Sequence, residues 1–369
     1  MIDRNFRTLT VEGERLHEDG ILGWCDQLVQ RFDHAPWTLH VQAVLKELVA
    51  ADGPLALRTS GTTGIPKEIR VPREDLIASA RLTGDSFSLK AGDRVLHCLP
   101  SYYVAGKMMW VRAMVLGLDV EVVPPTARAA LLRKTDRAIR FSAMIPLQVS
   151  TALKERGSAA LDGIDILLLG GGPISKDLVC SMQQIATRCF AGYGSTETLT
   201  HVALRQLNGG DQASLEPVYQ ALGKVSFTTD EHDRLIIDTP HLSTMRHRTN
   251  DVVELIDEHR FIWRGRYDHV ILSGGRKFHA EQLEEAVLGL MPWPIFFIGT
   301  PDAELGQCVT LVCEGERPGD EELAKHLDRM RRKLDRHAFP RLVIFRERFI
   351  RTATGKIERA RTLRSTDQP

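Results

Sequence analysis

The sequence predicts an α/β protein with a large N-terminal part and a small α+β part at its C-terminal end. Short apolar runs alternate with helix-like stretches through most of the chain, which is typical of sheets covered by helices. The pattern changes past residue 265, where a compact unit of about a hundred residues begins. With 369 residues the chain is long enough for two or three domains. We expect the boundary near Arg264 to Asp268.

In the N-terminal part, four apolar runs of strand length are separated by helical patterns. Helices are expected where apolar residues recur about every three to four positions, and strands where they are continuous or alternate. The predicted strands are residues 95–99, 120–123, 143–145 and 166–169. The predicted helices are residues 37–50, 74–83, 106–117 and 175–187.

In the C-terminal part, Leu283, Val287 and Leu290 fall at positions i, i+4 and i+7. This spacing predicts an amphipathic helix over 280–291. A second, highly charged helix is expected over 320–338. Three further runs predict strands at 295–299, 308–313 and 342–346.

Composition excludes several classes of protein. Lys+Arg and Asp+Glu both number 48, so no net charge attracts nucleic acid or an anionic membrane. Six cysteines form no Cys-x-x-Cys pair, so neither a zinc site nor a disulfide framework is indicated. The first residues are too polar for a signal peptide, and apolar runs are far too short to span a membrane. We therefore expect a cytoplasmic protein without membrane insertion.

The densest local pattern is the run Thr59-Ser60-Gly61-Thr62-Thr63-Gly64-Ile65-Pro66-Lys67, directly after an apolar run. Glycines let the backbone wrap closely around an anion, while N–H groups and hydroxyls donate to phosphate oxygens and the lysine neutralises charge. The spacing differs from a Walker A loop. The alternative interpretation is a polar hairpin with turn glycines.

Two further motifs are weak by themselves. In Gly192-Tyr193-Gly194-Ser195-Thr196-Glu197-Thr198, an aromatic ring between glycines can stack on a purine. Thr196 offers a hydroxyl to a phosphate and Glu197 a carboxylate to Mg²⁺, which prefers few carboxylates plus phosphate oxygens. In Thr249-Asn250-Asp251, the carboxylate can accept from ribose hydroxyls, although such a triplet is more often a turn or a helix cap.

The last two motifs lie in the C-terminal part. One is Gly265-Arg266-Tyr267-Asp268-His269-Val270-Ile271-Leu272-Ser273-Gly274-Gly275-Arg276-Lys277. The other is Thr352-Ala353-Thr354-Gly355-Lys356-Ile357-Glu358-Arg359. A basic segment near a C-terminus is usually a solvated tail, so these motifs gain meaning only from the order of all five.

Five motifs in this order resemble the adenylate-forming superfamily of acyl-CoA synthetases, luciferases and peptide-synthetase adenylation domains, from about Leu55 to Arg359. The resemblance implies a domain of residues 1–265, a hinge of residues 266–269 centred on Asp268, and a small mobile domain of residues 270–369. It implies ATP, Mg²⁺ and coenzyme A as cofactors or substrates.

The resemblance also implies a role for each position. Tyr193 would stack on adenine, Asp251 would bind the ribose, and Glu197 would hold Mg²⁺. The catalytic set would be Lys67, Thr196, Glu197 and the mobile Lys356. The nucleotide-binding set would be Thr59, Ser60, Gly61, Thr62, Thr63, Gly64, Gly171, Gly172, Tyr193, Gly194, Asp251 and Arg266. Gly274 and Gly275 would let the backbone approach the pantetheine arm of coenzyme A.

The expected reaction has two steps. A carboxylate is ionised at neutral pH and can attack the α-phosphate of ATP without a general base, so the obstacle is repulsion between two anions. Positioning and positive charge from Lys356, Mg²⁺ and the 59–67 loop would overcome it. Since Lys356 would then occupy the path of the thiol, rotation about the hinge is expected before thioester formation.

The acid can be narrowed by resemblance to the compact o-succinylbenzoate–CoA ligases. Only 58 residues precede Thr59, fewer than in most of the superfamily. Residues 99–109, 145–148 and 168–174 also resemble that group, although Tyr103 stands where many relatives have His. The resemblance therefore implies o-succinylbenzoate as substrate in menaquinone biosynthesis.

A second carboxylate on that acid would need a cation in the pocket. Lys107 and Arg112 lie in one apolar segment, and their five-residue offset predicts that only one points inward. We favour Lys107, against the alternative that it reaches solvent. Tyr103, Thr200 and His201 are the other pocket candidates.

Three alternatives remain open from the sequence. The chain could activate another aryl or acyl acid by the same mechanism, or load a carrier protein. In another class, it could be a catalytically inactive nucleotide-binding protein, against which the presence of both Lys67 and Lys356 argues. A homodimer is neither required nor excluded.

Overall fold

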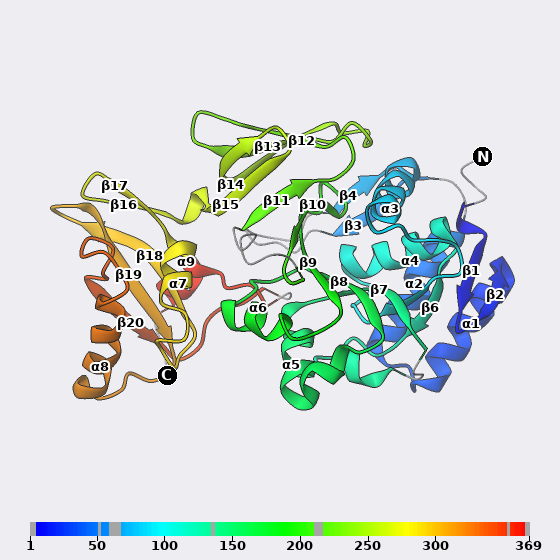
Figure 1. Cartoon of the computed structure of the whole chain (residues 1–369), viewed down its shortest axis with the longest axis horizontal. Coiled ribbons are helices and arrows are strands. Elements are labelled where there is room, and N and C mark those ends of the chain that lie inside the picture. The colour runs from blue at the N-terminus through cyan, green and yellow to red at the C-terminus, as the bar shows by residue number, and fades with distance from the viewer. Residues whose placement is uncertain are drawn as a thin grey trace.

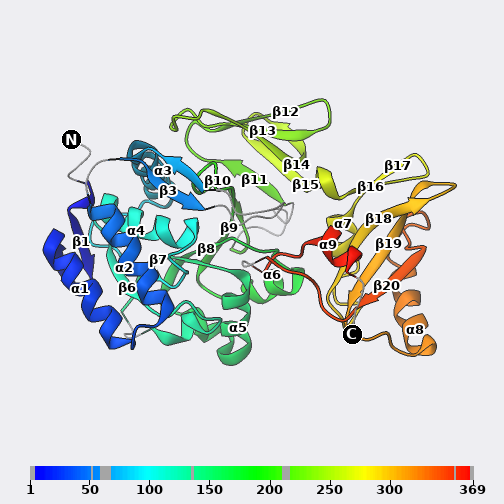
Figure 2. The ribbon, with the colours of Figure 1, turned by 180° about the vertical axis from the view of Figure 1, so that it is seen from behind.

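The computed structural model describes residues 5–50, 53–58, 68–133, 137–209, 217–352 and 355–365. Within these residues the strands form a large sheet, a smaller sheet near the C-terminus and a two-stranded hairpin. Figure 1 shows the smaller sheet and its helices to one side of the large sheet, with the last part of the chain reaching back between them. Figure 2 shows the same arrangement from behind.

The large sheet begins with a parallel part. β5 pairs in parallel with β6 and β7, and parallel pairing continues through β8 to β9. β6 also pairs in parallel with β1, which forms an edge hairpin with β2. These strands are β1 (Thr8–Val11), β2 (Glu14–His17), β5 (Arg94–His97), β6 (Asp119–Val122), β7 (Ile139–Met144), β8 (Ile164–Leu169) and β9 (Arg188–Gly194).

Helices cover both faces of this parallel part, because side chains of its strands alternate between two hydrophobic cores. In β8, Ile166 and Leu168 belong to the core under the first four helices, whereas Leu167 and Leu169 face the other core. The first set is α1 (Glu18–Arg31), α2 (Pro36–Val49), α3 (Arg73–Phe87) and α4 (Val104–Leu116). The second set is η2 (Ala129–Leu132), α5 (Pro146–Arg156), η3 (Gly157–Leu161) and α6 (Lys176–Met182).

The sheet continues as antiparallel strands from β10 to β15 around a separate aromatic and aliphatic core that includes Phe227 and Phe261. The strands are β10 (His201–Gln206), β11 (Val218–Ala221), β12 (Ser226–Thr229), β13 (Arg234–Asp238), β14 (Arg246–Asp257) and β15 (Arg260–Arg266). A separate hairpin pairs β3 (Leu55–Arg58) with β4 (Glu68–Val71).

The smaller sheet follows a short 3-10 helix, η5 (Tyr267–His269). It packs its helices around a core that includes Phe297 and Met330, each fully buried. Burying one such side chain contributes about 1.5–3 kcal/mol. The elements are β16 (Val270–Ser273), β17 (Arg276–His279), α7 (Ala280–Ala286), β18 (Ile295–Asp302), β19 (Gly306–Glu314), α8 (Asp320–Arg331), β20 (Leu342–Arg346) and α9 (Arg359–Arg364).

The expected α/β fold class is confirmed, and the predicted strands and helices all have counterparts; the strand predicted at 342–346 has the predicted ends, and the others differ at one or both ends. The helix expected over 280–291 is wrong beyond Ala286, because Gly289 with φ +76° turns the chain there. The helix expected over 320–338 ends at Arg331, and Asp335 then accepts from the N–H of His337 in a local turn that competes with helix. α6 is also shorter than its predicted range 175–187.

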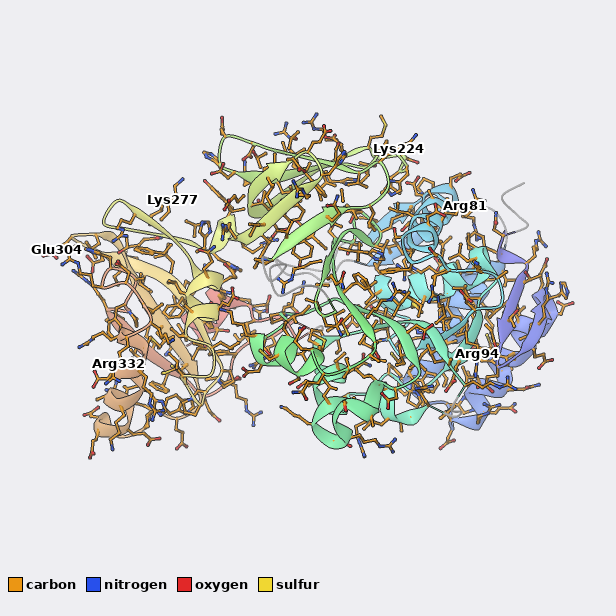
Figure 3. The ribbon with its side chains drawn as sticks, viewed as in Figure 1. Arg81, Arg94, Lys224, Lys277, Glu304 and Arg332 are labelled. Carbon is orange, nitrogen blue, oxygen red and sulfur yellow. The ribbon has the colours of Figure 1, made fainter. Side chains whose placement is uncertain are left out.

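Charged side chains of both signs cover the surface, as the balanced composition suggests. Figure 3 shows Lys277, Glu304 and Arg332, all exposed, projecting from the C-terminal unit. Among the residues that the structure describes, no helix has the length and apolar character needed to cross a membrane.

Candidate active site

Loops that follow the parallel strands gather at one edge of the large sheet. The carboxyl ends of parallel strands meet at the same edge, where α/β proteins commonly bind ligands. Gly171 and Gly172 follow β8, and a Cβ added to them would lie 3.4 Å from Ile145 and 3.7 Å from Pro146, which follow β7. The side-chain amide of Gln148 donates to the carbonyl of Cys98 at 2.8 Å, which ties in the loop after β5. The predicted glycines therefore lie at this edge.

The close approach of β10 to the end of β9 explains why position 194 is a glycine. A Cβ on Gly194 would lie 2.0 Å from the carbonyl oxygen of Thr200, so β9 and β10 can meet here only through a glycine. The following turn is held by the N–H of Ser195, which donates to the Thr198 hydroxyl at 2.9 Å. This turn leaves Thr196 half-buried and Glu197 exposed, and neither side chain has a hydrogen-bond partner within the described residues.

Tyr193 and Asp251 meet across the sheet. The Tyr193 hydroxyl donates to Oδ2 of Asp251 at 2.6 Å. Burial raises the pKa of the phenol well above its usual value, and the negative charge of Asp251 raises it further, so the group stays a neutral donor. The ring packs edge-to-face on Phe261, with centroids 5.0 Å apart. Asp251 is further oriented because its N–H donates to the Thr249 hydroxyl at 3.1 Å.

Arg266 stands opposite Asp251 in the β14–β15 register. Its guanidinium lies 3.8 Å from Oδ1 of Asp251 and donates to Asp268 at 3.1 Å. Partial burial lowers the pKa of Arg266, but the hydrogen bond to Asp268 and the charge of Asp251 outweigh it and raise the pKa overall. Arg266 therefore remains a cation between the ribose candidate and the predicted hinge residue.

Lys356 comes to the same place from the end of the chain. Lys356 as a whole residue is exposed, yet surrounding protein partly desolvates its ammonium and lowers its pKa, the charge of Arg266 lowers it further, and Asp251 opposes the shift. Its segment folds as a hairpin, in which Thr352 N–H donates to the Lys356 carbonyl at 2.8 Å. The structure thus brings together Tyr193, Asp251, Arg266 and Lys356, from four separate segments.

Lys107 does not occupy the position that we favoured for it. Its ammonium donates to Oε2 of Glu47 at 2.7 Å and to the carbonyl of Ala56 at 2.8 Å. Glu47 also accepts from the N–H of Ala56 at 3.2 Å. The lysine is therefore committed to α2 and β3, since α4 is apolar on all sides and each polar side chain in it depends on a neighbouring element for a partner.

Arg112 instead points toward the other pocket candidates. It is 2 % exposed, and its Nη2 donates to the Thr200 hydroxyl at 2.5 Å. No carboxylate lies within ion-pair distance of it among the described residues. Burial lowers the pKa of Arg112 to about 10, which leaves it charged at neutral pH. Within the part of the chain that the structure describes, Arg112 is therefore a buried cation without a counter-charge.

His201 continues this polar chain. The Thr200 hydroxyl, which accepts from Arg112, lies 2.9 Å from Nδ1 of His201 and has its proton to donate there. Burial lowers the pKa of His201 well below its usual value, and the charge of Arg112 lowers it further. The ring is then neutral with its proton on Nε2, and this buried atom has no partner within the described residues.

Other predicted residues lie apart from this group or outside the described residues. Tyr103 is the N-cap residue just before α4 and packs edge-on against Tyr102, with ring centroids 5.3 Å apart. Gly274 and Gly275 form the turn between β16 and β17, which extends away from the large sheet (Figures 1 and 2). The predicted phosphate loop lies outside the described residues, with Thr59, Ser60, Gly61, Thr62, Thr63, Gly64 and Lys67.

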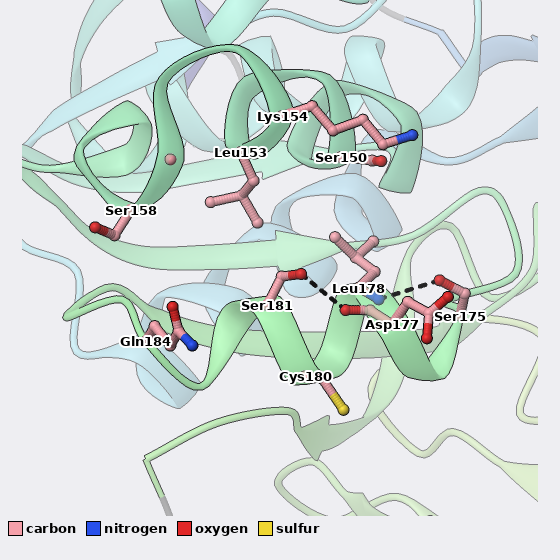
Figure 4. Close-up of a pocket in the computed structure, with 11 residues that line it drawn as sticks. Ser150, Leu153, Lys154, Ser158, Ser175, Asp177, Leu178, Cys180, Ser181 and Gln184 are labelled. Carbon is pink, nitrogen blue, oxygen red and sulfur yellow. Dashed lines mark hydrogen bonds between the residues drawn. The ribbon is translucent and has the colours of Figure 1, made fainter.

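A hollow of about 490 Å³ lies elsewhere, between α5 and α6. Figure 4 shows Ser150, Lys154, Ser175 and Cys180 among its lining residues. No predicted site residue lines it. Two of its serines are engaged locally, since Ser175 caps α6 and Ser181 donates to the carbonyl of Asp177. It therefore contributes nothing to the candidate active site.

The side-chain oxygens at the site fit a Mg²⁺ ion that is coordinated mainly by phosphate and water oxygens. Among the described residues no group of three or more His, Cys, Asp or Glu side chains could hold a metal by itself. Glu197 offers one exposed carboxylate beside the Thr196 hydroxyl. A few carboxylates with phosphate and water oxygens are the ligands that Mg²⁺ prefers.

Three residues at the site were missed by sequence reasoning. Thr249 orients Asp251, Glu281 contacts His269 in the predicted hinge, and Arg359, three residues after Lys356, donates to Glu281. Thr249 and Arg359 stand inside the quoted motifs, so the sequence contained a signal for them. Glu281 lies outside every motif, and only its spatial neighbours identify it.

Comparison with known proteins places this geometry in a family. The family model described as AMP-binding enzyme matches residues 32–230. A probable 2-succinylbenzoate–CoA ligase of Mycobacterium tuberculosis is 28% identical over 343 residues, covering 86% of each chain. An acyl-CoA synthetase (AMP-forming)/AMP-acid ligase II-like protein of Dyadobacter fermentans is 32% identical in sequence, with a TM-score of 0.59 over 89% of this chain and 94% of that one.

A third similarity concerns the fold. The o-succinylbenzoate CoA synthetase of Bacillus subtilis, solved with its acyl-adenylate intermediate, gives a TM-score of 0.74 at 18% identity, over 88% of this chain and 74% of that one. The family match spans more than half of this chain, and the expected superfamily is confirmed. The chain belongs to the AMP-binding enzyme family.

Proposed function

We propose that this enzyme activates 2-succinylbenzoate with ATP as an acyl-adenylate and transfers the acyl group to coenzyme A. Family membership supports the adenylation chemistry. The names of its relatives support the acid and the thiol, since several are called 2-succinylbenzoate–CoA ligases. A place in menaquinone biosynthesis and a cytoplasmic location belong to the same proposal.

The observation that carries the choice of acid is the environment of Arg112. Arg112 donates to the hydroxyls of Thr83 and Thr200, but a buried charge that lacks an opposite charge is still destabilising by several kcal/mol. A bound acid with a second carboxylate supplies the missing negative charge, and the unpartnered Nε2–H of His201 supplies a further donor. In an acid with one carboxylate, that group reacts with ATP and cannot supply a negative charge to Arg112. The geometry therefore favours a dicarboxylic acid over a fatty acid.

In the first step, an oxygen of the acid's carboxylate bonds to the α-phosphorus of ATP, and the bond to the bridging oxygen breaks to release pyrophosphate. Asp251, held by Tyr193, binds the ribose and fixes the nucleotide. Arg266 and Lys356 bring positive charge to the phosphates, which reduces the repulsion between the two anions. Glu197 and Thr196 would hold Mg²⁺, which neutralises phosphate charge when bound.

In the second step, the thiol sulfur of coenzyme A bonds to the acyl carbon, AMP leaves with the bonding electron pair, and the thiol proton goes to solvent. Lys356 lies beside Asp251 and Arg266, where it suits the first step. We propose that residues 270–369 rotate as one domain about Asp268 relative to residues 1–265. The sheets support this division, since the large sheet ends with β15 at Arg266 and the small one begins with β16 at Val270. Gly274 and Gly275 would meet the pantetheine arm only after such a rotation.

The test is acid-dependent exchange of labelled pyrophosphate into ATP by the purified protein. The acids are 2-succinylbenzoate, benzoate, malonate and a long-chain fatty acid, and mass spectrometry follows the thioester and AMP. We expect exchange with 2-succinylbenzoate, and a thioester with free coenzyme A rather than with a carrier protein. Exchange with a fatty acid instead would replace the acid that we propose, and formation of ADP would overturn the mechanism.

A substitution connects the acid to Arg112. Methionine in place of a buried arginine fills similar volume without a charge and is commonly tolerated by the fold. We expect Arg112→Met to lower kcat/KM for 2-succinylbenzoate about a hundredfold, equivalent to about 2.7 kcal/mol. The KM for ATP should change much less. An equal loss in both would show that Arg112 serves the fold rather than the acid.

A further inference from the structure

Glu281 joins three parts of the C-terminal half of the chain. It is the second residue of α7, and its side chain is 15% exposed. One carboxylate oxygen, Oε1, lies 2.5 Å from Nδ1 of His269 and 3.3 Å from a guanidinium nitrogen of Arg359. The other, Oε2, accepts from the backbone N–H of Arg266 at 3.4 Å. A single carboxylate thus connects the end of β15, the 3-10 helix η5 and α9.

Glu281 can approach the end of β15 only because residue 265 is a glycine. Gly265 has φ +144°, and a Cβ there would lie 2.6 Å from Oε2 of Glu281. The carboxylate therefore packs directly on the backbone beside Arg266. Partial burial raises the pKa of Glu281, but its hydrogen bond with His269 and the charge of Arg359 outweigh burial and lower the pKa below the usual value. Glu281 is then an anion at neutral pH.

Arg359 connects the Glu281 carboxylate to the segment that carries Lys356. Its guanidinium donates to both carboxylate oxygens of Glu284, at 2.7 and 3.0 Å, and to the carbonyl of Phe297 at 3.0 Å. Arg359 follows Lys356 by three residues. Glu358, which lies between them, closes the base of the Lys356 hairpin, since its N–H donates to the Ile350 carbonyl at 2.8 Å. The base of the Lys356 hairpin is therefore fixed to α7.

These contacts differ in how they relate to the hinge. His269, Arg359 and Glu281 all follow Asp268 in the chain, so their mutual contacts survive a rotation about that residue. The contact of Glu281 with Gly265 and Arg266 crosses Asp268 and must break. Figures 1 and 2 show α7 and α9 side by side, next to the segment that reaches toward the large sheet.

We infer that Glu281 is a positioning residue for the adenylation step: it holds the strand end that carries Arg266 against the unit that carries Lys356. This inference rests on the proposed function and deepens it. The same contact opposes the rotation that precedes thioester formation. Loss of the Glu281 charge therefore slows the first half-reaction and does not slow the second.

A matched control exists on the same helix. Glu285 forms an ion pair at 3.4 Å with Lys176 of α6, which also connects the two parts of the molecule. Its side chain is 59% exposed and that of Lys176 is 65% exposed. Exposed ion pairs contribute little because water screens them. Glu285→Gln removes the same charge from α7 without touching β15.

The first experiment separates the half-reactions in wild type, Glu281→Gln and Glu285→Gln. Acid-driven pyrophosphate exchange reports adenylation, and single-turnover thioester formation from supplied acyl-adenylate and coenzyme A reports the second step. We expect Glu281→Gln to slow exchange about tenfold and to leave the second step unchanged or faster. Glu285→Gln should change neither by more than about twofold. Equal loss in both half-reactions, or no loss in either, overturns the inference.

The second experiment needs no turnover. Cys180 on α6 is exposed and the other five cysteines are buried, so Cys180 and a Glu322→Cys substitution on α8 accept a pair of fluorescent labels. Energy transfer between them reports the arrangement of the two parts. We expect Glu281→Gln to broaden or shift the distribution seen in wild type, while Glu285→Gln leaves it unchanged. An unchanged distribution in Glu281→Gln overturns the positioning role, even for a variant with altered activity.

The two experiments also separate this inference from the proposed function. Absence of exchange with every acid in the wild-type protein would reject the proposed function alone. The energy-transfer measurement would still decide whether Glu281 holds the two parts together.

Discussion

The phenolic hydroxyl of Tyr193 donates a 2.6 Å hydrogen bond to Asp251, although the two residues are 58 positions apart. Tyr193 is the last residue but one of β9 in the parallel part of the sheet, and Asp251 lies in β14 of the antiparallel part. The bond therefore joins the two halves of the large sheet at the predicted ribose site. It also gives the aromatic residue a second role, since its hydroxyl orients the carboxylate.

Removal of that hydroxyl tests the relationship. We expect Tyr193→Phe to raise the KM for ATP about tenfold, or about 1.4 kcal/mol, because Asp251 loses a charge-assisted hydrogen bond. The matched control is Tyr219→Phe, since Tyr219 stacks on the same Phe261 at 5.4 Å and its hydroxyl has no hydrogen-bond partner among the residues that the structure describes. Steady-state kinetics with varied ATP measure both. An equal effect of the two substitutions would contradict a specific role for the Tyr193 hydroxyl.

Lys107 should affect the region before the predicted phosphate loop rather than the acid. Replacement by Met leaves the carbonyl of Ala56 without its donor and Glu47 without its cation, so we expect a loss of about 1–3 kcal/mol in the free energy of unfolding. Urea denaturation measures it. Because Ala56 precedes residues 59–67, the KM for ATP should rise more than the KM for the acid. A selective rise in the KM for the acid would show that Lys107 binds the acid, as the sequence analysis predicted.

Glu284 predicts a pH dependence of stability. Burial raises its pKa from 4.5 to about 7, although the charge of Arg359 opposes the shift. Folding then takes up a proton between about pH 4.5 and 7, so the stabilisation is complete below about 4.5 and is lost as pH rises through about 7. We expect wild type to lose stability relative to Glu284→Gln over that window. Glu281 does not contribute to this pH dependence. Its pKa is lowered, so its contribution to stability is lost only as the pH falls below the usual pKa of a glutamate.

Parallel thermal unfolding of the two proteins from pH 4.5 to 8 measures the difference. A constant difference in unfolding free energy across the window would show that Glu284 does not titrate there.

Gly194 should tolerate no side chain. A Cβ 2.0 Å from the Thr200 carbonyl forces β9 and β10 apart, so we expect Gly194→Ala to destabilise by at least about 3 kcal/mol and to weaken nucleotide binding. Gly23→Ala is the control, because nothing lies within 4 Å of its Cβ position on α1, and it should stabilise by about 0.5–1 kcal/mol. Urea denaturation and fluorescence titration with ATP test both. An unchanged stability of Gly194→Ala would contradict the close strand approach.

Secondary structure followed from the sequence where apolar periodicity was strong. The four N-terminal strands and the helices around them were anticipated, and so was the change of architecture after residue 265. α1 was not anticipated, although Ile21, Cys25 and Leu28 show helical spacing and are buried. Helix ends were wrong where a local turn at Gly289 or Asp335 competed with further helix. Periodicity reports burial, whereas a helix end depends on local hydrogen bonds.

By itself the sequence determined the family and the chemistry of the site, because the motifs carry residue types whose chemistry is local and independent of distant partners. Only the tertiary structure decided which cation lies beside the pocket candidates Thr200 and His201. Lys107 donates to Glu47, sixty positions earlier in the chain, and Arg112 donates to Thr200, eighty-eight positions later. Both lie on a helix that is apolar on every side, so helical spacing could not distinguish them. The partner that each buried charge requires was supplied by packing between segments far apart in the chain.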